Sequence, residues 1–212
     1  ARLVIIGAGI VGVSAAYHLA QKGWRDIVVL DQNELYHTGG STSHAPGLVF
    51  QTNGSKLMCD FAQYTVGLLS ELHQLSTPDK PVWYDVGGVE VAYTPERMAE
   101  LKRKHGLATS YGLESHLISS AEVKQMVPIL DDKVIVGGYY VPTDGDTKAV
   151  HAVEMMAARA SADGAVVFHG DVPVTDIEFE TKNGHISAVV TPKGKINTEQ
   201  VLLCTNIWSP VL

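Results

Sequence analysis

The chain has 212 residues, of which 45% are hydrophobic and 18% charged, a composition that is ordinary for a globular protein. Its formal net charge of −7, without any basic stripe, argues against a nucleic-acid partner. Two cysteines without a CxxC pair indicate neither a disulfide framework nor a metal site, and no apolar run is long enough to span a membrane. We therefore expect a protein of a reducing compartment that has no metal and no membrane or nucleic-acid partner.

Two short apolar runs open the chain. Residues 2–6 and 27–30 are expected to be buried parallel strands, and residues 10–22 between them a helix that Gly23 ends. Together these segments make one βαβ unit. Residues 31–54 are rich in Gly, Ser, Thr, Asn and His, which predicts a long irregular loop of the kind that often carries function.

The middle of the chain alternates between helical and strand-like patterns. A helix is predicted over 55–75, strand-like sequence over 82–93, and a further helix over 95–106 that ends at its glycine. Ser119 and Glu122 form a capping box for another short helix. The helix over 55–75 is expected to bury one apolar face, made of Leu57, Phe61, Tyr64, Leu68, Leu72 and Leu75.

The remainder predicts one more helix among several strands. A strand over 134–141 and a turn at Asp144-Gly145 precede a helix over 147–163. Four strands follow, at 165–169, 172–180, 185–191 and 196–203, with Asn183-Gly184 as a hairpin turn. The predicted fold class is therefore α/β, with a parallel sheet, a β-meander over 172–203 and an inserted segment over 81–143.

The turn after the first strand carries a GxGxxG pattern, Gly7-Ala8-Gly9-Ile10-Val11-Gly12. The first glycine allows a tight turn, the second lets the backbone approach a pyrophosphate, and the third lets helix and strand pack closely. The helix N-terminus offers free N–H groups to the phosphates. An acid at the end of the second strand is placed to accept from ribose hydroxyl groups and disfavours the 2′-phosphate of NADP. We predict a dinucleotide site that includes Gly7, Gly9, Ile10, Val11, Gly12 and Asp31.

The motif alone does not separate FAD from NAD. In a plain NAD domain another βαβ strand follows the acid quickly, whereas here a polar loop over 39–47, GGSTSHAPG, leads into a long helix. Such a loop can wrap a bound cofactor, with the hydroxyl groups of Ser41, Thr42 and Ser43 as donors. This organisation favours FAD and weakens the alternative of an NAD-dependent dehydrogenase.

The same loop resembles the segment that carries a covalently attached flavin in dimethylglycine oxidases, dimethylglycine dehydrogenases and sarcosine dehydrogenases, relatives of D-amino-acid oxidase. The likeness runs through DQNELYHTGGSTSHAPGLVFQTN and continues in VGGVEVA, GGYYVPTDG and VTDIE, and it is strongest to the bacterial dimethylglycine oxidases. It implies a Rossmann-like FAD-binding domain made of residues 1–80 and 144–212, with 81–143 as part of a substrate domain. Members of this family are far longer, so we expect the chain to be an N-terminal fragment.

The resemblance also implies roles for single residues. His44 would bond to the 8α-methyl group of the isoalloxazine ring, which is chemically sensible because neutral imidazole is a nucleophile. Gln32 would contact the adenosine, Leu48 would line the ring, and Val174 would contact the adenine through its backbone. The alternatives, a solvated loop histidine at position 44 and an ordinary strand valine at position 174, stay open.

One segment departs from the family pattern. After the strand VLLC, relatives usually carry an Ala-Gly pair before an aromatic residue, whereas this chain has Thr205-Asn206 before Ile207-Trp208. Asparagine tolerates a left-handed backbone, so we expect the turn to persist. The glycine that would bring the backbone close to the flavin is missing.

The implied reaction is the FAD-dependent oxidation of an N-methylated amino acid such as dimethylglycine or sarcosine, in which a hydride equivalent passes to flavin N5 and leaves an iminium. The expected partners are the small amine and, as electron acceptor, oxygen or an electron-transfer flavoprotein. Tetrahydrofolate is expected only in regions outside this chain, and the location is bacterial cytoplasm or the mitochondrial matrix. No catalytic acid or base is assigned. The alternative is a non-catalytic, FAD-binding regulatory relative, or an inactive fragment of the same family.

Overall fold

The computed structural model describes residues 1–36, 39–180 and 184–211. The chain forms two compact units. The first unit comprises Ala1–Pro46 and Ala149–Leu212, and the second comprises Gly47–Lys148. The assignment of residues 81–143 to a substrate domain stays a prediction.

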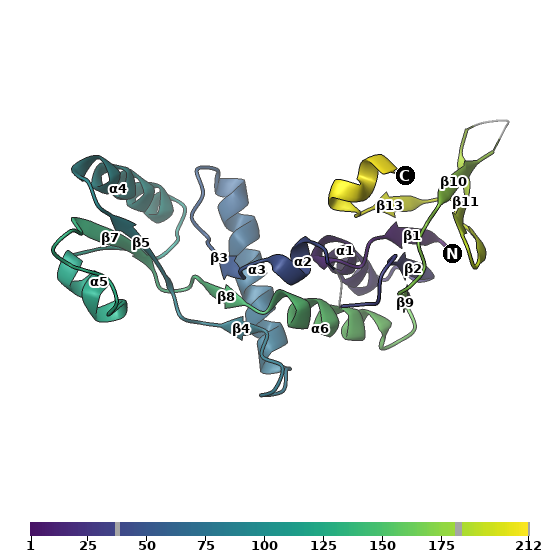
Figure 1. Ribbon diagram of the computed structural model, residues 1–212, viewed down its shortest axis with the longest axis horizontal. Coiled ribbons are helices and arrows are strands. Elements are labelled where there is room, and N and C mark those ends of the chain that lie inside the picture. The colour runs from purple at the N-terminus through teal and green to yellow at the C-terminus, as the bar shows by residue number, and fades with distance from the viewer. Residues whose placement is uncertain (37–38, 181–183, 212) are drawn as a thin grey trace. The chain divides into compact units, whose positions relative to one another are not determined.

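A four-stranded parallel sheet forms the centre of the first unit, in the order β13-β1-β2-β9 (Figure 1). These strands are β1 (Leu3–Ile6), β2 (Ile27–Leu30), β9 (Val166–His169) and β13 (Val201–Leu203). The register pairs Ile6 with Leu30 on one side and with Leu203 on the other, so the carboxyl ends of three neighbouring strands lie at one edge of the sheet. The predicted α/β class with a parallel sheet is confirmed.

The parallel sheet is covered on both faces. Because side chains alternate along a strand, Val4 and Ile6 point to one face, where they pack in one core with Leu30, Val172 and Val189. That core joins the sheet to an antiparallel meander of β10 (Asp176–Phe179), β11 (Ile186–Thr191) and β12 (Gly194–Asn197). Helices α1 (Ile10–Gln21) and α6 (Ala149–Ser161) pack against each other and against the sheet, and we place them on its other face.

The strand predicted over 196–203 is wrong, because this segment forms two strands in different sheets. Thr198 separates β12 from β13: its hydroxyl donates to the Gln200 carbonyl oxygen at 3.0 Å and accepts from the Gln200 N–H at 3.3 Å. This local turn redirects the chain from the meander to the parallel sheet. Of the predicted hairpin turn, Asn183 lies outside the described residues, and the flanking strands β10 and β11 pair antiparallel.

Two small antiparallel sheets organise the second unit. One has the order β3-β8-β4 and the other the order β5-β7-β6. Helix α4 packs on one face of the second sheet in a core with Leu101 and Tyr139, and α5 packs on the other face through Val123. The bounds are β3 (Leu48–Val49), β4 (Trp83–Tyr84), β5 (Gly88–Ala92), α4 (Pro95–Ser110), β6 (His116–Ile118), α5 (Ser120–Met126), β7 (Gly137–Val141) and β8 (Gly145–Thr147). The predicted capping box of Ser119 and Glu122 at the start of α5 is confirmed.

Helix α4 continues past the glycine that was expected to end it. A Cβ atom on Gly106 would meet nothing within 4 Å, so this glycine lies on an open side of the helix. The helix runs on because Ala108 is fully buried in the core of the sheet. The glycine that follows its end is Gly112, whose φ of 78° is left-handed and which lets Leu113 fold back into the same core.

The turn predicted at Asp144-Gly145 lies two residues earlier, at Pro142-Thr143, where the Asp144 N–H donates to the Val141 carbonyl oxygen at 3.3 Å, and Gly145 already begins strand β8. This glycine serves a close approach instead: a Cβ atom there would lie 2.4 Å from the ring of Trp83 and 2.3 Å from the Tyr84 carbonyl oxygen. Asp144 is buried beside it and accepts hydrogen bonds from the backbone N–H and the side-chain amide of Gln51 at 3.0 and 3.1 Å. Asp144 therefore ends the turn as a buried acceptor for Gln51 and not as a surface residue.

Helix α3 (Lys56–Gln74) has nearly the predicted extent but buries a different face. Its buried residues are Cys59, Leu69 and Leu72, so only Leu72 belongs to the predicted apolar stripe. The exposed members of that stripe are Leu57, Phe61, Tyr64 and Leu75, each more than half exposed. The pattern was ambiguous because the buried residues lie beside the stripe and make the helix apolar around more than one face.

The buried carboxyl group of Asp144 gives the second unit a pH-dependent stability. Burial raises the pKa of Asp144, and this outweighs the hydrogen bonds from Gln51 and the nearby Lys104, which lower it. A pKa that is higher in the folded state means that the favourable contribution is present below the unfolded-state value of about 4 and is lost as the pH rises through the folded-state value.

We therefore expect Asp144→Asn to flatten the pH dependence of the free energy of unfolding above about pH 4. The amide oxygen still accepts from Gln51, so the free energy of unfolding at pH 7 should rise by about 1 kcal/mol or less. Urea unfolding of the intact protein between pH 4 and 8 measures both effects. Asp60→Asn, a change at an exposed carboxylate of α3, should keep the wild-type pH profile, and an Asp144→Asn profile as steep as wild type would contradict the assignment.

Candidate nucleotide site

The glycine-rich turn joins β1 to α1, and its three glycines differ in what surrounds them. Gly7 has a φ of 106°, and a Cβ atom there would lie 2.6 Å from the Cys204 carbonyl oxygen. A Cβ atom on Gly12 would lie 1.9 Å from the carbonyl oxygen of Gly7, so this glycine permits the contact between turn and helix. A Cβ atom on Gly9 would meet only the hydroxyl oxygen of Thr42, at 3.2 Å. Gly7 and Gly12 are therefore required by the fold, whereas Gly9 leaves open space at the cavity.

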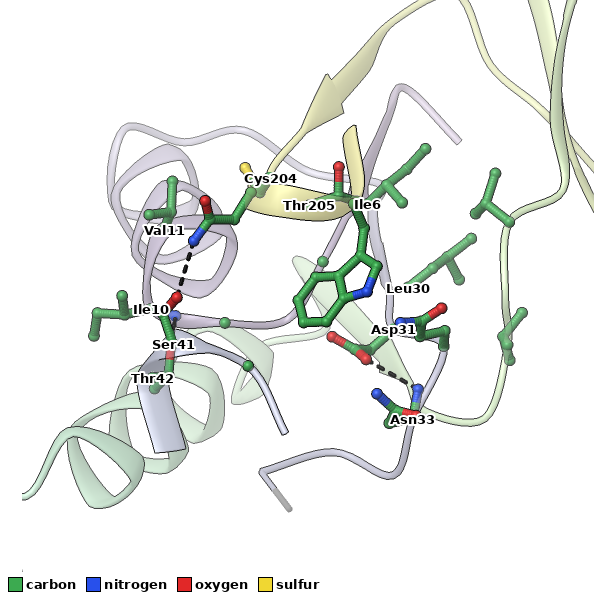
Figure 2. Close-up of a pocket in the computed structure, with 18 of the residues that line it drawn as sticks. Ile6, Ile10, Val11, Leu30, Asp31, Asn33, Ser41, Thr42, Cys204 and Thr205 are labelled. Carbon is green, nitrogen blue, oxygen red and sulfur yellow. Dashed lines mark hydrogen bonds between the residues drawn. The ribbon is translucent and has the colours of Figure 1, made fainter. Parts of the chain in front are cut away.

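Asp31 follows the last residue of β2 and is tied to the glycine-rich turn. One carboxylate oxygen accepts from the Ala8 N–H at 2.8 Å. The other accepts from the Asn33 N–H at 3.0 Å, the contact that Figure 2 shows as a dashed line between Asp31 and Asn33. Each oxygen of a carboxylate can accept more than one hydrogen bond, so the group can still accept from a ligand hydroxyl. Asp31 thus fixes the turn and presents an acceptor at the same time.

The loop after β2 contains a short helix that the sequence did not predict, α2 (Ser41–His44). The hydroxyl oxygen of Thr42 accepts from the Ile10 N–H at 2.9 Å, which places α2 against the N-terminus of α1. His44 is exposed at the end of α2, and its Nδ1 donates to the Gly40 carbonyl oxygen at 3.0 Å. The Ser43 hydroxyl oxygen also lies 3.2 Å from Nδ1, so both of these contacts are made by Nδ1 and not by Nε2. A four-residue helix has no periodicity, and for that reason the loop was expected to be irregular.

The segment after β13 forms the opposite wall. Asn206 has a φ of 50°, so the left-handed turn expected for asparagine is present, and its side-chain amide donates to the Ser41 hydroxyl oxygen at 2.9 Å. Cys204 packs near Gly12, and burial raises the pKa of its thiol, which keeps it protonated at neutral pH. A 3-10 helix, η1 (Asn206–Val211), continues the chain and brings Trp208 to the cavity.

These segments enclose a cavity of ≈ 410 Å³ at the carboxyl edge of the parallel sheet (Figure 2). Of the residues singled out from the sequence, those that line it are Gly7, Gly9, Ile10, Val11, Asp31, Gln32, Ser41, Thr42 and Val174. Gly12 lies behind the turn, Ser43 and His44 are on α2 outside the lining, and Leu48 belongs to the second unit. Gly40 of the predicted cofactor loop and Thr205, Asn206 and Trp208 of the segment expected near the flavin also line it. The lining residues that sequence reasoning missed are Ile6, Leu30, Asn33, Val172, Thr175 and Cys204.

Comparison with known proteins decides the family. Residues 2–212 match the family described as DAO, FAD dependent oxidoreductase. The chain belongs to this family. The predicted family and its FAD cofactor are thereby confirmed.

Relatives show how much of a longer protein the chain represents. Human mitochondrial sarcosine dehydrogenase is 33% identical over 212 residues, which is 99% of this chain and 23% of that protein. The mitochondrial pyruvate dehydrogenase phosphatase regulatory subunit of Mus musculus is 31% identical over 209 residues, with the same coverage. The crystal structure of L-proline dehydrogenase from P. horikoshii superposes with a TM-score of 0.87 at 26% identity and covers 100% of this chain and 54% of that chain. The chain thus spans about a quarter of the length of these curated relatives.

The cavity of this family member fits the nucleotide part of FAD. Its backbone is open at Gly9, where a pyrophosphate would approach, and Ile10 and Val11 at the N-terminus of α1 line the same place, although the Ile10 N–H already donates to Thr42. Asp31 would supply the acceptor for the ribose. Its volume lies within the usual range of ligand pockets, about 300–1,000 Å³. Among the described residues, no group of His, Cys, Asp and Glu side chains is placed to hold a metal ion, and no helix of this part is long and apolar enough to cross a membrane.

Proposed function

We propose that this chain is the cofactor-binding part of an oxidoreductase that uses FAD, tethered at His44, to oxidise an N-methylated amino acid such as dimethylglycine or sarcosine. The observation that carries the proposal is the position of α2. Thr42 of this helix caps the N-terminus of α1, where the nucleotide cavity lies, and His44 follows two residues later with one imidazole nitrogen available. A histidine held in this way is suited to form a bond with a cofactor that fills the cavity.

Different residues of the chain would bind different parts of the cofactor. Gly9 and the N-terminal N–H groups of α1 would receive the pyrophosphate, Asp31 the ribose, and the backbone near Val174 the adenine. Ser41 and Thr42 close the cavity from the side of α2. When bound, FAD accepts a hydride equivalent from a C–H bond next to the amine nitrogen, which leaves an iminium to be hydrolysed or passed on. Oxygen or an electron-transfer flavoprotein would then take up the electrons.

The second candidate is a regulatory protein that binds FAD without turning it over. It is favoured by one finding, the 31% identity to a phosphatase regulatory subunit, which is close to the 33% identity to sarcosine dehydrogenase. Both candidates use the same cavity. They differ in whether the bound flavin can be reduced by an amine.

Anaerobic addition of sarcosine or dimethylglycine to the intact protein separates the two candidates. If the proposal is right, at least one of these amines bleaches the visible flavin band, and glycine, which has no N-methyl group, serves as the matched compound. A band that neither amine bleaches, in protein that dithionite does bleach, would favour the regulatory function. Admission of air to the bleached sample then tests the acceptor, because rapid recovery of colour indicates an oxidase.

A further inference from the structure

A single side-chain hydrogen bond joins two segments of the first unit that are 165 residues apart in the sequence. The amide nitrogen of Asn206 donates to the Ser41 hydroxyl oxygen at 2.9 Å, and Figure 2 shows this contact as the dashed line that reaches Ser41. Ser41 is the first residue of α2, the helix that presents His44. Asn206 is the first residue of η1, directly after the cavity-lining Cys204 and Thr205.

The backbone at position 206 would accept a glycine as readily as an asparagine. Its φ of 50° is left-handed, a conformation that glycine adopts without strain and that asparagine tolerates better than most residues. Asparagine therefore preserves the turn and adds a donor that glycine lacks. The amide donates to Ser41 of α2 and not to a neighbour within its own turn. Its role is therefore to connect the segment after β13 to α2, which a glycine could not do.

Helix α2 depends on such outside contacts. Four residues are far too few for a helix to be stable by itself, because the first turn fixes several dihedral angles for one hydrogen bond. Two hydrogen bonds hold it from outside, where Thr42 accepts from the Ile10 N–H and where Ser41 accepts from Asn206, and the helix also packs against α6. Its N-cap residue, Gly40, offers no side-chain cap. The position of His44 is therefore set by α1 and α6 together with the segment after β13, which the hydrogen bond from Asn206 joins to α2.

We propose that Asn206 is a positioning residue for flavin attachment: its amide holds α2 at the mouth of the nucleotide cavity and thereby places His44 for bond formation. This inference rests on the proposed tether at His44. Attachment joins an imidazole nitrogen to the 8α-carbon of the flavin, breaks one N–H and one C–H bond, and releases two protons and two electrons. Molecular oxygen takes up the electrons. Asn206 touches none of these atoms and acts through Ser41.

The test compares the rate of covalent attachment in cofactor-free intact protein after FAD is added, followed by flavin fluorescence on denaturing gels. Asn206→Gly keeps the left-handed turn and removes the donor, and Ser41→Ala removes the acceptor. We expect each change to slow attachment about 3- to 10-fold, the size of one modest hydrogen bond. The double variant should be no slower than either single variant, because both remove the same contact.

A control variant and a second measurement test the role of Asn206 independently of whether His44 carries the covalent flavin. Ser209→Ala removes the hydrogen bond between the hydroxyl groups of Ser209 in η1 and Thr205 just before it, a contact that does not involve α2, and it should leave the attachment rate unchanged. Amide hydrogen exchange over residues 39–45 of the cofactor-free protein should rise in Asn206→Gly and Ser41→Ala and stay at the wild-type level in Ser209→Ala. If wild-type protein forms no covalent flavin, the proposed bond at His44 is refuted, and the exchange measurement still tests whether Asn206 holds α2. Unchanged exchange or an unchanged attachment rate in Asn206→Gly would overturn the role of Asn206.

Discussion

Replacement of His44 with alanine is expected to convert a flavin that stays with the acid-precipitated protein into one that leaves with the supernatant. His44 is exposed on α2 and has one ring nitrogen tied to the Gly40 carbonyl oxygen, so its removal deletes the nucleophile without opening a core. The stability of the protein should change by less than about 0.5 kcal/mol, as for most surface substitutions. The effect on covalent flavin should be complete, since the other described histidines are not on α2.

The measurement is simple in the intact protein. Acid precipitation and centrifugation are followed by the absorbance of pellet and supernatant, and the unfolded protein is also examined for flavin fluorescence on a denaturing gel. His116→Ala, at an exposed histidine of the second unit that contacts Glu114, is the matched control and should keep its flavin in the pellet. Yellow supernatant from wild-type protein would refute the tether, although not the nucleotide site.

Substitution of Gly12 by alanine is expected to destabilise the first unit by about 3 kcal/mol or more, because overpacking against a backbone atom forces the structure to move. The added Cβ atom would stand 1.9 Å from the Gly7 carbonyl oxygen, and neither α1 nor the turn can shift without losing contacts of the sheet. Thermal unfolding of the intact protein should show an earlier transition. FAD would be lost as a consequence.

Gly9→Ala is the matched change and should separate folding from binding. Gly9 has a φ of −75°, which alanine adopts freely, and its Cβ atom would meet only the Thr42 hydroxyl at 3.2 Å. We expect a thermal transition within a few degrees of wild type, with an affinity for FAD that is lower by about 100-fold, or ~2.7 kcal/mol. Gly9→Ala protein that binds FAD as well as wild type would show that the pyrophosphate does not approach this glycine.

The parts of the site that could be predicted from the sequence are those set by local geometry. The three glycines of the GxGxxG turn lie within six consecutive residues after β1, and Asp31 follows the last residue of β2. The motif could therefore be predicted without a structure. The part of the cavity wall formed by Val172, Thr175 and Cys204 could not be predicted, because it depends on which distant strands end beside β1. The strand order β13-β1-β2-β9 is set by tertiary packing and cannot be deduced from local sequence patterns.

Two other differences have the same origin. The face that α3 buries is chosen by its neighbours in the second unit, and an apolar stripe could not select it when Leu69 lies beside that stripe. Asp144 reads as a turn residue in the sequence, whereas Gln51, 93 residues earlier, makes it a buried acceptor. In both cases the local pattern was compatible with more than one arrangement and a long-range contact decided between them.

The sheet order also sets a sequence of events during synthesis. The strand β1, which begins the glycine-rich turn, lies between β2 and β13, and about 200 residues separate Gly7 from Trp208 across the same cavity. The whole second unit is translated between the two halves of that cavity. A nascent chain that has reached only the second unit therefore has one wall of the cavity, and FAD can be captured only after the meander and β13 have emerged and docked.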